Sequence, residues 1–394
     1  MDIETFHWLL TSEGQQLLVI ATEAYVDAAG DPVRAAASVR RTEPNAEKAA
    51  AAMTQIDLRR RSVAKFGELG LHMYFTPDAL EQSTRLRVAE HRAGRVAAAS
   101  PSSVVDLGCG IGGDLIAFSR HGLITAGVDL DPLRVEMAKA NLEALGLAGA
   151  VMEADATTLA LDGFGVVYAD PARRTGRGRV FDVDGWTPPW SFVESLLTRA
   201  AVVKVAPGIP HELVPDGVEA EWVSDGGEVK EAALWASYLA SAKRRATVIA
   251  ESGLATLTEE DDPYDGKARP VRDLGRCLYE PDGAVIRAGL VTAVAAGVGG
   301  GLVDEHIAYV TADDAFHSPF ARGYEILEVL PYREKMLKLA LRQRNIGPLT
   351  IKKRGVDVVP EQLRKRLALT GDEPATLVLT RVAGHGTALL VRPF

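Results

Sequence analysis

The chain has 394 residues, 47% of them hydrophobic and 25% charged, which is the composition of an ordinary globular protein with two or three domains. No run of about 18 apolar residues is present and the N-terminus is acidic, so we expect neither a transmembrane helix nor a signal peptide. The only cysteines, Cys109 and Cys277, exclude a disulfide scaffold and fit a cytoplasmic protein, and no His/Cys cluster has the spacing of metal ligands.

Charge is unevenly distributed along the chain, whose net charge is −9. From Arg322 to Phe394 there are 14 Lys/Arg and 7 Asp/Glu, a net charge of +7, so the remaining residues carry −16. Such asymmetry can mark a basic binding surface or only a solvated helix face, and the charge alone leaves both open. Two basic runs, residues 352–354 and 364–366, are the part of this region that we expect to contact phosphates if it binds nucleic acid.

Residues 1–98 predict a helical domain, because Ala, Glu, Leu and Arg dominate and β-branched runs are scarce. Thr76 followed by Pro77 is typical of a helix start, with threonine as the N-cap and proline in the first turn. We expect that helix to run towards Arg95. The aromatic segment before it, residues 72–75, either closes over a ligand or packs beneath the helices, and we favour packing.

Residues 99–258 alternate between short apolar strands and helices, which predicts a parallel sheet covered on both faces. Val218–Tyr238 predicts two strands around the turn at 225–227, an antiparallel hairpin. The other expected strands are 104–107, 124–128, 149–154, 165–169 and 200–205, and the expected helices are 114–121, 131–145 and 191–198.

The charged stretch from Glu259 to Pro270 predicts a linker. Residues 270–394 then predict a further α/β region. Its expected elements are a basic helix at 333–344 and strands near 351–354, 376–381 and 388–392. We therefore expect three parts, covering residues 1–98, 99–258 and 270–394.

The first candidate binding motif is the glycine-rich turn D-L-G-C-G-I-G-G at 106–113. Glycines between a strand and a helix let the backbone approach a ligand closely, where a side chain would clash. Gly108, Gly110 and Gly113 also satisfy the dinucleotide pattern G-x-G-x-x-G, and Asp129 lies where a ribose-binding acid is expected. The loop alone therefore fits either NAD or S-adenosylmethionine (SAM).

Three acidic positions favour SAM. Asp106 can neutralise an amino group but would repel a pyrophosphate. Asp155, just past the third strand and followed by Ala156, is placed to accept from an adenine amino group, and Asp170–Pro171 follows the fourth strand. The carboxyl ends of parallel strands are where open α/β sheets bind ligands. The alternative is that these acids only cap helices.

In this order, the motifs resemble those of class I SAM-dependent methyltransferases. The resemblance covers about 130 residues and comprises Val104–Gly113, Gly127–Asp129, Asp155 and Asp170–Pro171. It implies a Rossmann-like sheet with SAM as the cofactor. The cofactor-binding residues that it implies are Asp106, Gly108, Gly110, Gly112, Asp129, Asp155 and Ala156.

The C-terminal residues, from about 320 to 394, resemble the THUMP-like domain attached to some bacterial methyltransferases. The motifs that carry this second resemblance are residues 318–322, 351–357 and 377–381. THUMP domains bind RNA, usually from the N-terminal side of the enzyme, whereas here the order is inverted. The implied fold is thus an α/β protein with an N-terminal helical domain, a methyltransferase sheet and a C-terminal α/β THUMP-like domain.

The implied reaction is an in-line methyl transfer, in which the protein mainly aligns the reactants and excludes water. In methyltransferases that act on nitrogens, a D/N-P-P-Y/F motif receives the target amino group. Asp170–Pro171 keeps the hydrogen-bonding half of that motif, whereas Ala172 and Arg173 replace the second proline and the aromatic residue. Asp170, Pro171 and Arg173 are our catalytic candidates, and the methylated atom stays open.

Basic residues surround this motif in the sequence. Arg173, Arg174, Arg177 and Arg179 lie together, and arginine can bind phosphate bidentately and stack on bases. They could equally pair with nearby acids, and we favour the substrate role. Lys204, at the end of the fifth strand, either faces the same cleft or is structural.

The leading hypothesis is a cytoplasmic methyltransferase that acts on a base nitrogen in RNA, with RNA rather than DNA or a membrane as its partner. One alternative is a small-molecule methyltransferase whose basic domain is structural. Another is an NAD-dependent oxidoreductase, against which Asp106 and Asp170–Pro171 argue. The last is a non-catalytic RNA-binding protein that keeps the fold.

Overall fold

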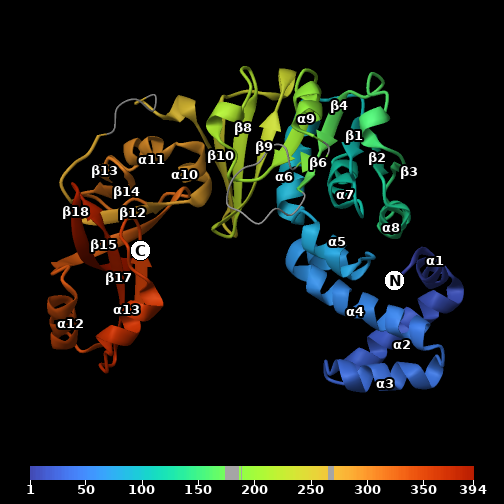
Figure 1. Cartoon of the computed structure of the whole chain (residues 1–394), viewed down its shortest axis with the longest axis horizontal. Coiled ribbons are helices and arrows are strands. Elements are labelled where there is room, and N and C mark those ends of the chain that lie inside the picture. The colour runs from blue at the N-terminus through green and yellow to red at the C-terminus, as the bar shows by residue number, and fades with distance from the viewer. Residues whose placement is uncertain (174–185, 188, 265–269) are drawn as a thin grey trace. The chain divides into compact units, whose positions relative to one another are not determined.

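The structure, a computed structural model, describes residues 1–173, 186–187, 189–264 and 270–394 (Figure 1). It contains two compact units, neither of which is a single stretch of chain. Unit 1 comprises Met1–Val205 and Leu234–Ala240, and unit 2 comprises Ala206–Ala233 and Ser241–Phe394. This division reflects which residues pack together in space and does not test domain boundaries along the sequence. The three parts predicted from the sequence therefore stay predictions. Within the described ranges, no helix is both long and apolar enough to cross a bilayer.

The first 98 residues of unit 1 are helical, as predicted, and α1 to α4 pack against one another (Figure 1). Polar side chains cap the helix starts; Asn45, for example, accepts from the backbone N–H groups of Glu47 and Lys48 at 3.0 and 3.1 Å. The helices are α1 (Ile3–Leu10), α2 (Ser12–Asp27), α3 (Pro32–Thr42), α4 (Ala46–Phe66), α5 (Pro77–Gln82) and α6 (Leu86–Ala98), with a 3₁₀ turn at Gly67–Leu71.

The helix that begins at Thr76 is shorter than predicted. Thr76 is the N-cap, accepting from the N–H of Ala79 at 3.2 Å, but α5 ends at Gln82 and α6 starts afresh at Leu86. The ammonium group of Lys65 donates to the carbonyls of residues 80, 81 and 83 at 2.8, 2.5 and 2.9 Å. A single helix towards Arg95 was therefore the wrong prediction, because a side chain distant in sequence stabilises the end of α5.

Met73, Tyr74 and Phe75 of the segment before α5 are buried, as the packing interpretation predicts, whereas His72 is exposed. Gln55 of α4 bonds both backbone groups of Phe75, donating to its carbonyl at 2.7 Å and accepting from its N–H at 3.0 Å. Asn141 of α8 (Pro132–Ala144) does the same for Tyr74, at 3.2 and 2.6 Å, and also donates to the carbonyl of Ile111 at 2.9 Å. Asn141 thus ties the N-terminal helices to the glycine-rich turn.

The sheet of unit 1 has the order β3-β2-β1-β4-β7, with the end of β9 beside β7. All four pairings among β3, β2, β1, β4 and β7 are parallel, as predicted. Its strands are β1 (Val104–Leu107), β2 (Thr125–Asp129), β3 (Ala150–Glu153), β4 (Val166–Ala169) and β7 (Ala201–Val205), and the helices between them are α7 (Gly113–Arg120), α8 and α9 (Trp190–Leu196). A separate antiparallel pair joins β5 (Ala172–Arg173) to β6 (Trp186–Thr187).

The predicted hairpin is present, and β8 (Glu219–Asp225) and β9 (Glu228–Trp235) are neighbours. Unit 2 contains the hairpin except for Leu234 and Trp235, which belong to unit 1. The turn between them places Gly226 and Gly227 at φ +63° and +82°, a left-handed conformation that favours glycine. β10 (Arg244–Ala250) pairs parallel to β8, and β11 (Gly253–Thr258) pairs antiparallel to β10. The sequence did not distinguish these last two strands.

The C-terminal part of unit 2 is a seven-stranded sheet of order β13-β14-β12-β15-β18-β17-β16. The predicted C-terminal helix and strands are present, and each strand is longer than predicted. The strands are β12 (Cys277–Pro281), β13 (Gly301–Asp304), β14 (Ile307–Ala312), β15 (Ala321–Leu330), β16 (Ile346–Lys353), β17 (Glu373–Val382) and β18 (His385–Pro393); the helices are α10 (Gly283–Ala288), α11 (Val291–Gly297), α12 (Glu334–Gln343) and α13 (Pro360–Leu367).

Candidate cofactor and active site

The predicted site residues of unit 1 lie at the carboxyl ends of its parallel strands. The glycine-rich turn follows β1, Asp129 ends β2, Asp155 follows β3, and Asp170–Pro171 follows β4. Lys204, which the sequence left undecided, is the next-to-last residue of β7. The topology therefore brings these residues to one edge of the sheet.

The glycine-rich turn needs glycine at three positions for two different reasons. Gly108, Gly110 and Gly112 have φ values of +90°, +55° and +85°. A Cβ added at Gly108 or Gly110 would meet no described atom within 4 Å, so open space faces both, whereas one at Gly112 would lie 3.3 Å from the Cβ of Ala138. The first two glycines leave room for a ligand, and the third lets α7 approach α8.

Asp106 is a buried acid with an unsatisfied oxygen. Its residue is 2% exposed, and its Oδ1 has no hydrogen-bond partner among the described residues. Burial, followed by the nearby charges of Asp114 and Asp170, raises the pKa of Asp106 well above its ordinary value. Such an atom fits a site for a cationic group, because an amino or sulfonium group would compensate the buried charge.

The other two acids have partners inside the protein. Asp129 accepts from the N–H of Gly110 at 2.9 Å and from that of Asp131 at 2.9 Å, so it helps to hold the glycine-rich turn. Asp155 is exposed and accepts from the N–H and hydroxyl of Thr157 at 2.8 and 2.7 Å. Asp155 therefore caps the 3₁₀ turn that starts at Ala156, which was the alternative left open for the acids.

The candidate catalytic acid belongs to a chain of hydrogen bonds. The ammonium group of Lys204 donates to Asp170 at 2.5 Å and to the hydroxyl of Thr84 at 3.1 Å. The Thr84 hydroxyl donates in turn to Asp114 at 3.1 Å, and Asp114 pairs with the buried guanidinium of Arg92. The Arg92 guanidinium also lies 4.7 Å from the centre of the Tyr168 ring. Lys204 thus holds Asp170 directly, and Thr84, Asp114 and Arg92 hold Lys204 through successive contacts.

The sequence pointed to only some of the residues in this series of hydrogen bonds. Lys204 was noticed for its place at a strand end, but Thr84, Arg92 and Asp114 were not noticed at all. Thr84 lies in the break between α5 and α6, where it reaches a lysine 120 positions away. No sequence spacing signals that contact. The backbone of Arg173 is in β5, but its side chain, like Arg174, Arg177 and Arg179, lies outside the described residues.

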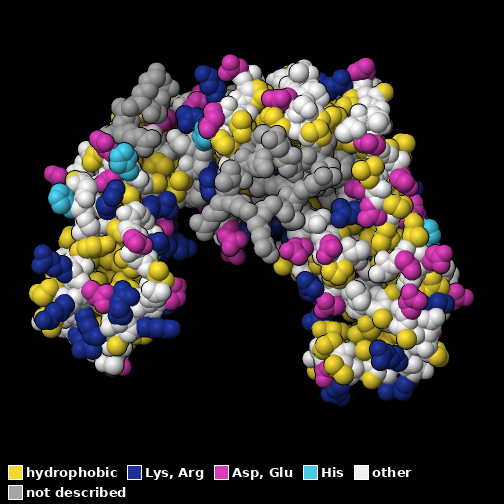
Figure 2. Space-filling view, in the orientation of Figure 1, with side chains coloured by type: hydrophobic (Ala, Val, Ile, Leu, Met, Phe, Trp, Pro, Cys, Tyr) yellow, Lys and Arg dark blue, Asp and Glu magenta, His cyan; other side chains and the backbone are white. Residues whose placement is uncertain are grey.

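The basic runs of the C-terminal region are partly neutralised. Lys and Arg side chains are frequent on the surface over α12 and α13 (Figure 2). However, Lys352 pairs with Glu280 at 2.6 Å and Arg366 with Glu334 at 3.0 Å. Burial lowers the pKa of Lys352 less than its bonds to Glu280 and Tyr324 raise it, so the net shift is upward. Within the described residues, the side chains of Lys353 and Lys365 have no such partner.

Three families match the chain. Residues 104–172 match a methyltransferase domain, and residues 321–393 match a THUMP domain-like family. Residues 2–62 match a domain of unknown function (DUF8688). The first two matches coincide with the two regions whose motifs were recognised in the sequence.

Similar proteins extend the match over most of the chain. Two curated proteins from Mycobacterium tuberculosis strains CDC 1551 and H37Rv, each described as an uncharacterized S-adenosylmethionine-dependent methyltransferase, are 38% identical over 353 residues, 85% of this chain and 95% of theirs. A crystal structure of a candidate methyltransferase from Porphyromonas gingivalis W83 has the same fold, with a TM-score of 0.75 and 23% identity over 96% of this chain and 98% of that one. The chain belongs to the class I SAM-dependent methyltransferases with a C-terminal THUMP-like domain, and SAM is its cofactor.

Proposed function

We propose that the enzyme transfers the methyl group of SAM to a base nitrogen in RNA. The observation that best supports a nitrogen as the target is the position of the Asp170 carboxylate. Lys204 donates to it at 2.5 Å, and its charge acts on the buried Asp106 nearby. A fixed carboxylate can accept an N–H bond and so aim the nitrogen lone pair. The THUMP domain-like match over residues 321–393 and the net charge of +7 from Arg322 onwards support RNA as the molecule that presents it.

In this proposal, the open space at Gly108 and Gly110 receives the cofactor, which supplies an activated methyl group on a sulfonium. Asp106 compensates the cationic amino end, and the Asp129 carboxylate accepts from the ribose hydroxyls. The turn that Asp155 caps, with the N–H of Ala156, holds the adenine. Gly112 acts by letting the helix after the turn pack closely.

Asp170 and Pro171 act on the substrate side of the proposed site. The Asp170 oxygen that Lys204 does not hold is available for the N–H of a base, and Pro171, which is buried, fixes the backbone at that point. Arg173 would bind a neighbouring phosphate.

A second candidate is methylation of a small molecule. It is favoured by the intramolecular ion pairs of the C-terminal region, since Arg344, Arg366 and Arg392 pair with Glu328, Glu334 and Glu325. Paired arginines contribute less to polyanion binding than free ones. RNA remains the first proposal because of the THUMP domain-like match.

One experiment separates the two functions. The purified enzyme is incubated with methyl-labelled SAM and either RNA or the small-molecule fraction from a strain that lacks its gene. We expect label in RNA from the deletion strain and little in RNA from the parent strain, where the position is already methylated. Nucleoside mass spectrometry then identifies the base. Label confined to the small-molecule fraction would reject RNA as the substrate.

The first prediction concerns Asp129. Asp129→Ala should weaken SAM binding by about 10- to 100-fold, because a hydrogen bond to a charged group contributes about 1.5–3 kcal/mol. Calorimetry with SAM measures this change. Asp131→Ala is the matched control, since Asp131 caps α8 and is not a proposed ligand. If both variants bind SAM equally well, Asp129 is not the ribose acid.

The second prediction follows from the raised pKa of Asp106. Binding a cationic group requires the ionised carboxyl, so below that raised pKa each SAM bound should release a proton. SAM affinity should therefore fall as the pH falls through the pKa of Asp106 and be constant above it. Calorimetry in buffers of different ionisation enthalpy counts the proton. Asp106→Asn should abolish this dependence, and an identical pH profile in the variant would contradict the assignment.

A further inference from the structure

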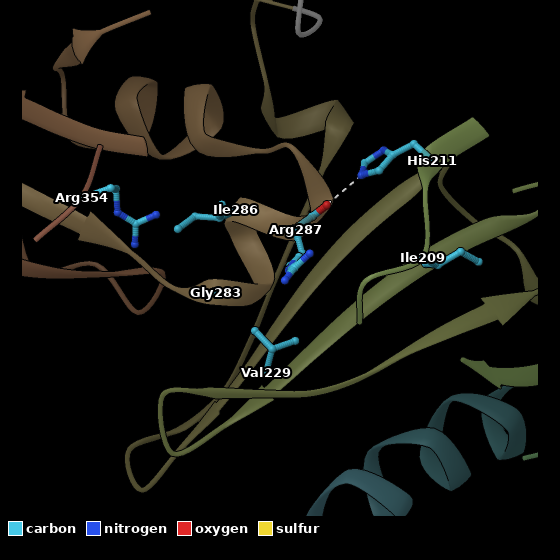
Figure 3. A pocket seen from close by; sticks show the side chains of 7 residues that line it. All are labelled: Ile209, His211, Val229, Gly283, Ile286, Arg287 and Arg354. Atoms are coloured by element: carbon cyan, nitrogen blue, oxygen red, sulfur yellow. Dashed lines mark hydrogen bonds between the residues drawn. The ribbon is translucent and has the colours of Figure 1, made fainter. Parts of the chain in front are cut away.

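A surface pocket in unit 2 is lined by basic and aliphatic side chains. It has a volume of about 570 Å³, within the range of roughly 300–1,000 Å³ typical of ligand sites. His211, Arg287 and Arg354 line it together with the aliphatic side chains of Ile209, Val229 and Ile286 (Figure 3). No acidic residue is among the described residues that line the pocket.

The pocket has a rigid frame. The His211 ring stacks on Trp222, with centroids 4.9 Å apart and planes 21° apart, and its Nε2 lies 2.8 Å from the carbonyl of Arg287, to which it donates (Figure 3). Trp222 donates to the carbonyl of Pro207 at 3.0 Å. Gly283 forms another part of the wall, where a Cβ would lie 2.5 Å from a methyl group of Val229. The backbone that carries Arg287 is therefore held in place.

Neither arginine of the pocket forms an ion pair with a described residue. Arg287 is exposed, and its guanidinium has no hydrogen-bond or ion-pair partner in the part of the chain that the structure describes. The Arg354 guanidinium lies 5.3 Å from the centre of the Tyr309 ring, and its Nε is buried without a partner among the described residues. By contrast, Arg344, Arg366 and Arg392 of the same unit each pair with a glutamate. Cations gathered without an acid favour binding of an anion.

We propose that this pocket binds a phosphodiester group of the RNA substrate. Arginine binds phosphate bidentately, and the exposed Arg287 side chain has no hydrogen-bond or ion-pair partner among the described residues. The aliphatic walls suit a ribose, and the size of the pocket exceeds that of an isolated ion. Arg354 lies within the THUMP domain-like match, so the pocket adds a defined contact to that region. This inference rests on the proposed function in naming RNA.

The test compares Arg287→Glu with Lys335→Glu. Both variants reverse one exposed charge in unit 2, but Lys335 is on α12 and does not line the pocket. Binding of a fluorescein-labelled single-stranded RNA of mixed sequence is measured by anisotropy over a potassium chloride series. We expect Arg287→Glu to bind about tenfold more weakly, with a salt slope lower by about 0.7. Lys335→Glu should change both much less, and both variants should bind SAM like the parent.

A second measurement does not depend on RNA. Inorganic phosphate is titrated into protein labelled at histidine, and the ring signals of His211, assigned with His211→Gln, are followed by NMR. We expect a shift in the parent and in Lys335→Glu that is absent in Arg287→Glu. If the two variants have equal RNA affinity and equal salt slope, the proposal that the pocket binds RNA is rejected. Binding of RNA by the parent would still be consistent with the proposed function. If the parent binds no RNA, the proposed function fails; the phosphate shift then still supports an anion site, and its absence overturns the pocket as well.

Discussion

Asp170→Ala should lower the single-turnover rate of methylation by about 10²- to 10³-fold while changing the affinity for SAM little. The carboxylate is fixed at the end of β4 by Lys204, and a preorganised acceptor of this kind typically contributes about 3–4 kcal/mol to the reaction barrier. None of the proposed cofactor contacts involves its side chain. Rapid-quench measurement at saturating SAM and RNA, together with calorimetry, separates the rate from the affinity.

Two further variants show whether the hydrogen-bond chain behind Asp170 matters. Lys204→Met keeps the length of the side chain but removes the donor to Asp170 and Thr84. Its single-turnover rate should therefore fall by most of the factor expected for Asp170→Ala. Thr84→Val, which removes only the bridging hydroxyl, should lose less. A rate for Asp170→Ala within threefold of the parent would remove Asp170 from the mechanism.

Asn141→Ala should lower the free energy of unfolding by about 3 kcal/mol or more. The Asn141 side chain is fully buried and satisfies three backbone groups, the N–H and carbonyl of Tyr74 and the carbonyl of Ile111. Each buried group left without a partner costs about 1–3 kcal/mol. Because Ile111 belongs to the glycine-rich turn, SAM affinity should fall as well. Urea unfolding followed by circular dichroism measures the stability.

Asn45→Ala provides the control for this change. Asn45 also accepts from two backbone N–H groups, but it is an exposed helix cap, so its loss should cost only about 1 kcal/mol. SAM affinity should be unaffected. If the two asparagine variants are equally stable, Asn141 does not have the clamping role that its contacts indicate.

The parts of the fold that depend on local chemistry could be predicted from the sequence. The strand–glycine–helix pattern from Val104 to Gly113 and the turn at Gly226–Gly227 follow from backbone preferences that a few neighbouring residues determine. The break after Gln82 could not be predicted in the same way, since it depends on Lys65 reaching three carbonyls. Local propensity gives no information about a partner that only the folded chain brings near.

The same distinction applies to the candidate site. Asp106, Asp129 and Asp170 could be named because strand ends in a parallel sheet meet at one edge. What holds Asp170 could not, because Lys204 and Thr84 are 120 positions apart. Asp155 shows the reverse case. Its position in the sequence fits both a ligand contact and a helix cap, and only the folded structure reveals its bond to Thr157.

The discontinuity of unit 1 has a consequence for synthesis on the ribosome. Ala236 donates its N–H to the carbonyl of Ala201 at 3.0 Å, yet residues 206–233 between them belong to unit 2. At roughly 5–20 residues per second, the ribosome needs several seconds after Val205 to produce Ala240. During that interval the nascent β7 is an unpaired edge, which is a template for wrong pairing. Slower translation across this stretch should therefore increase the demand for chaperones that bind exposed strands.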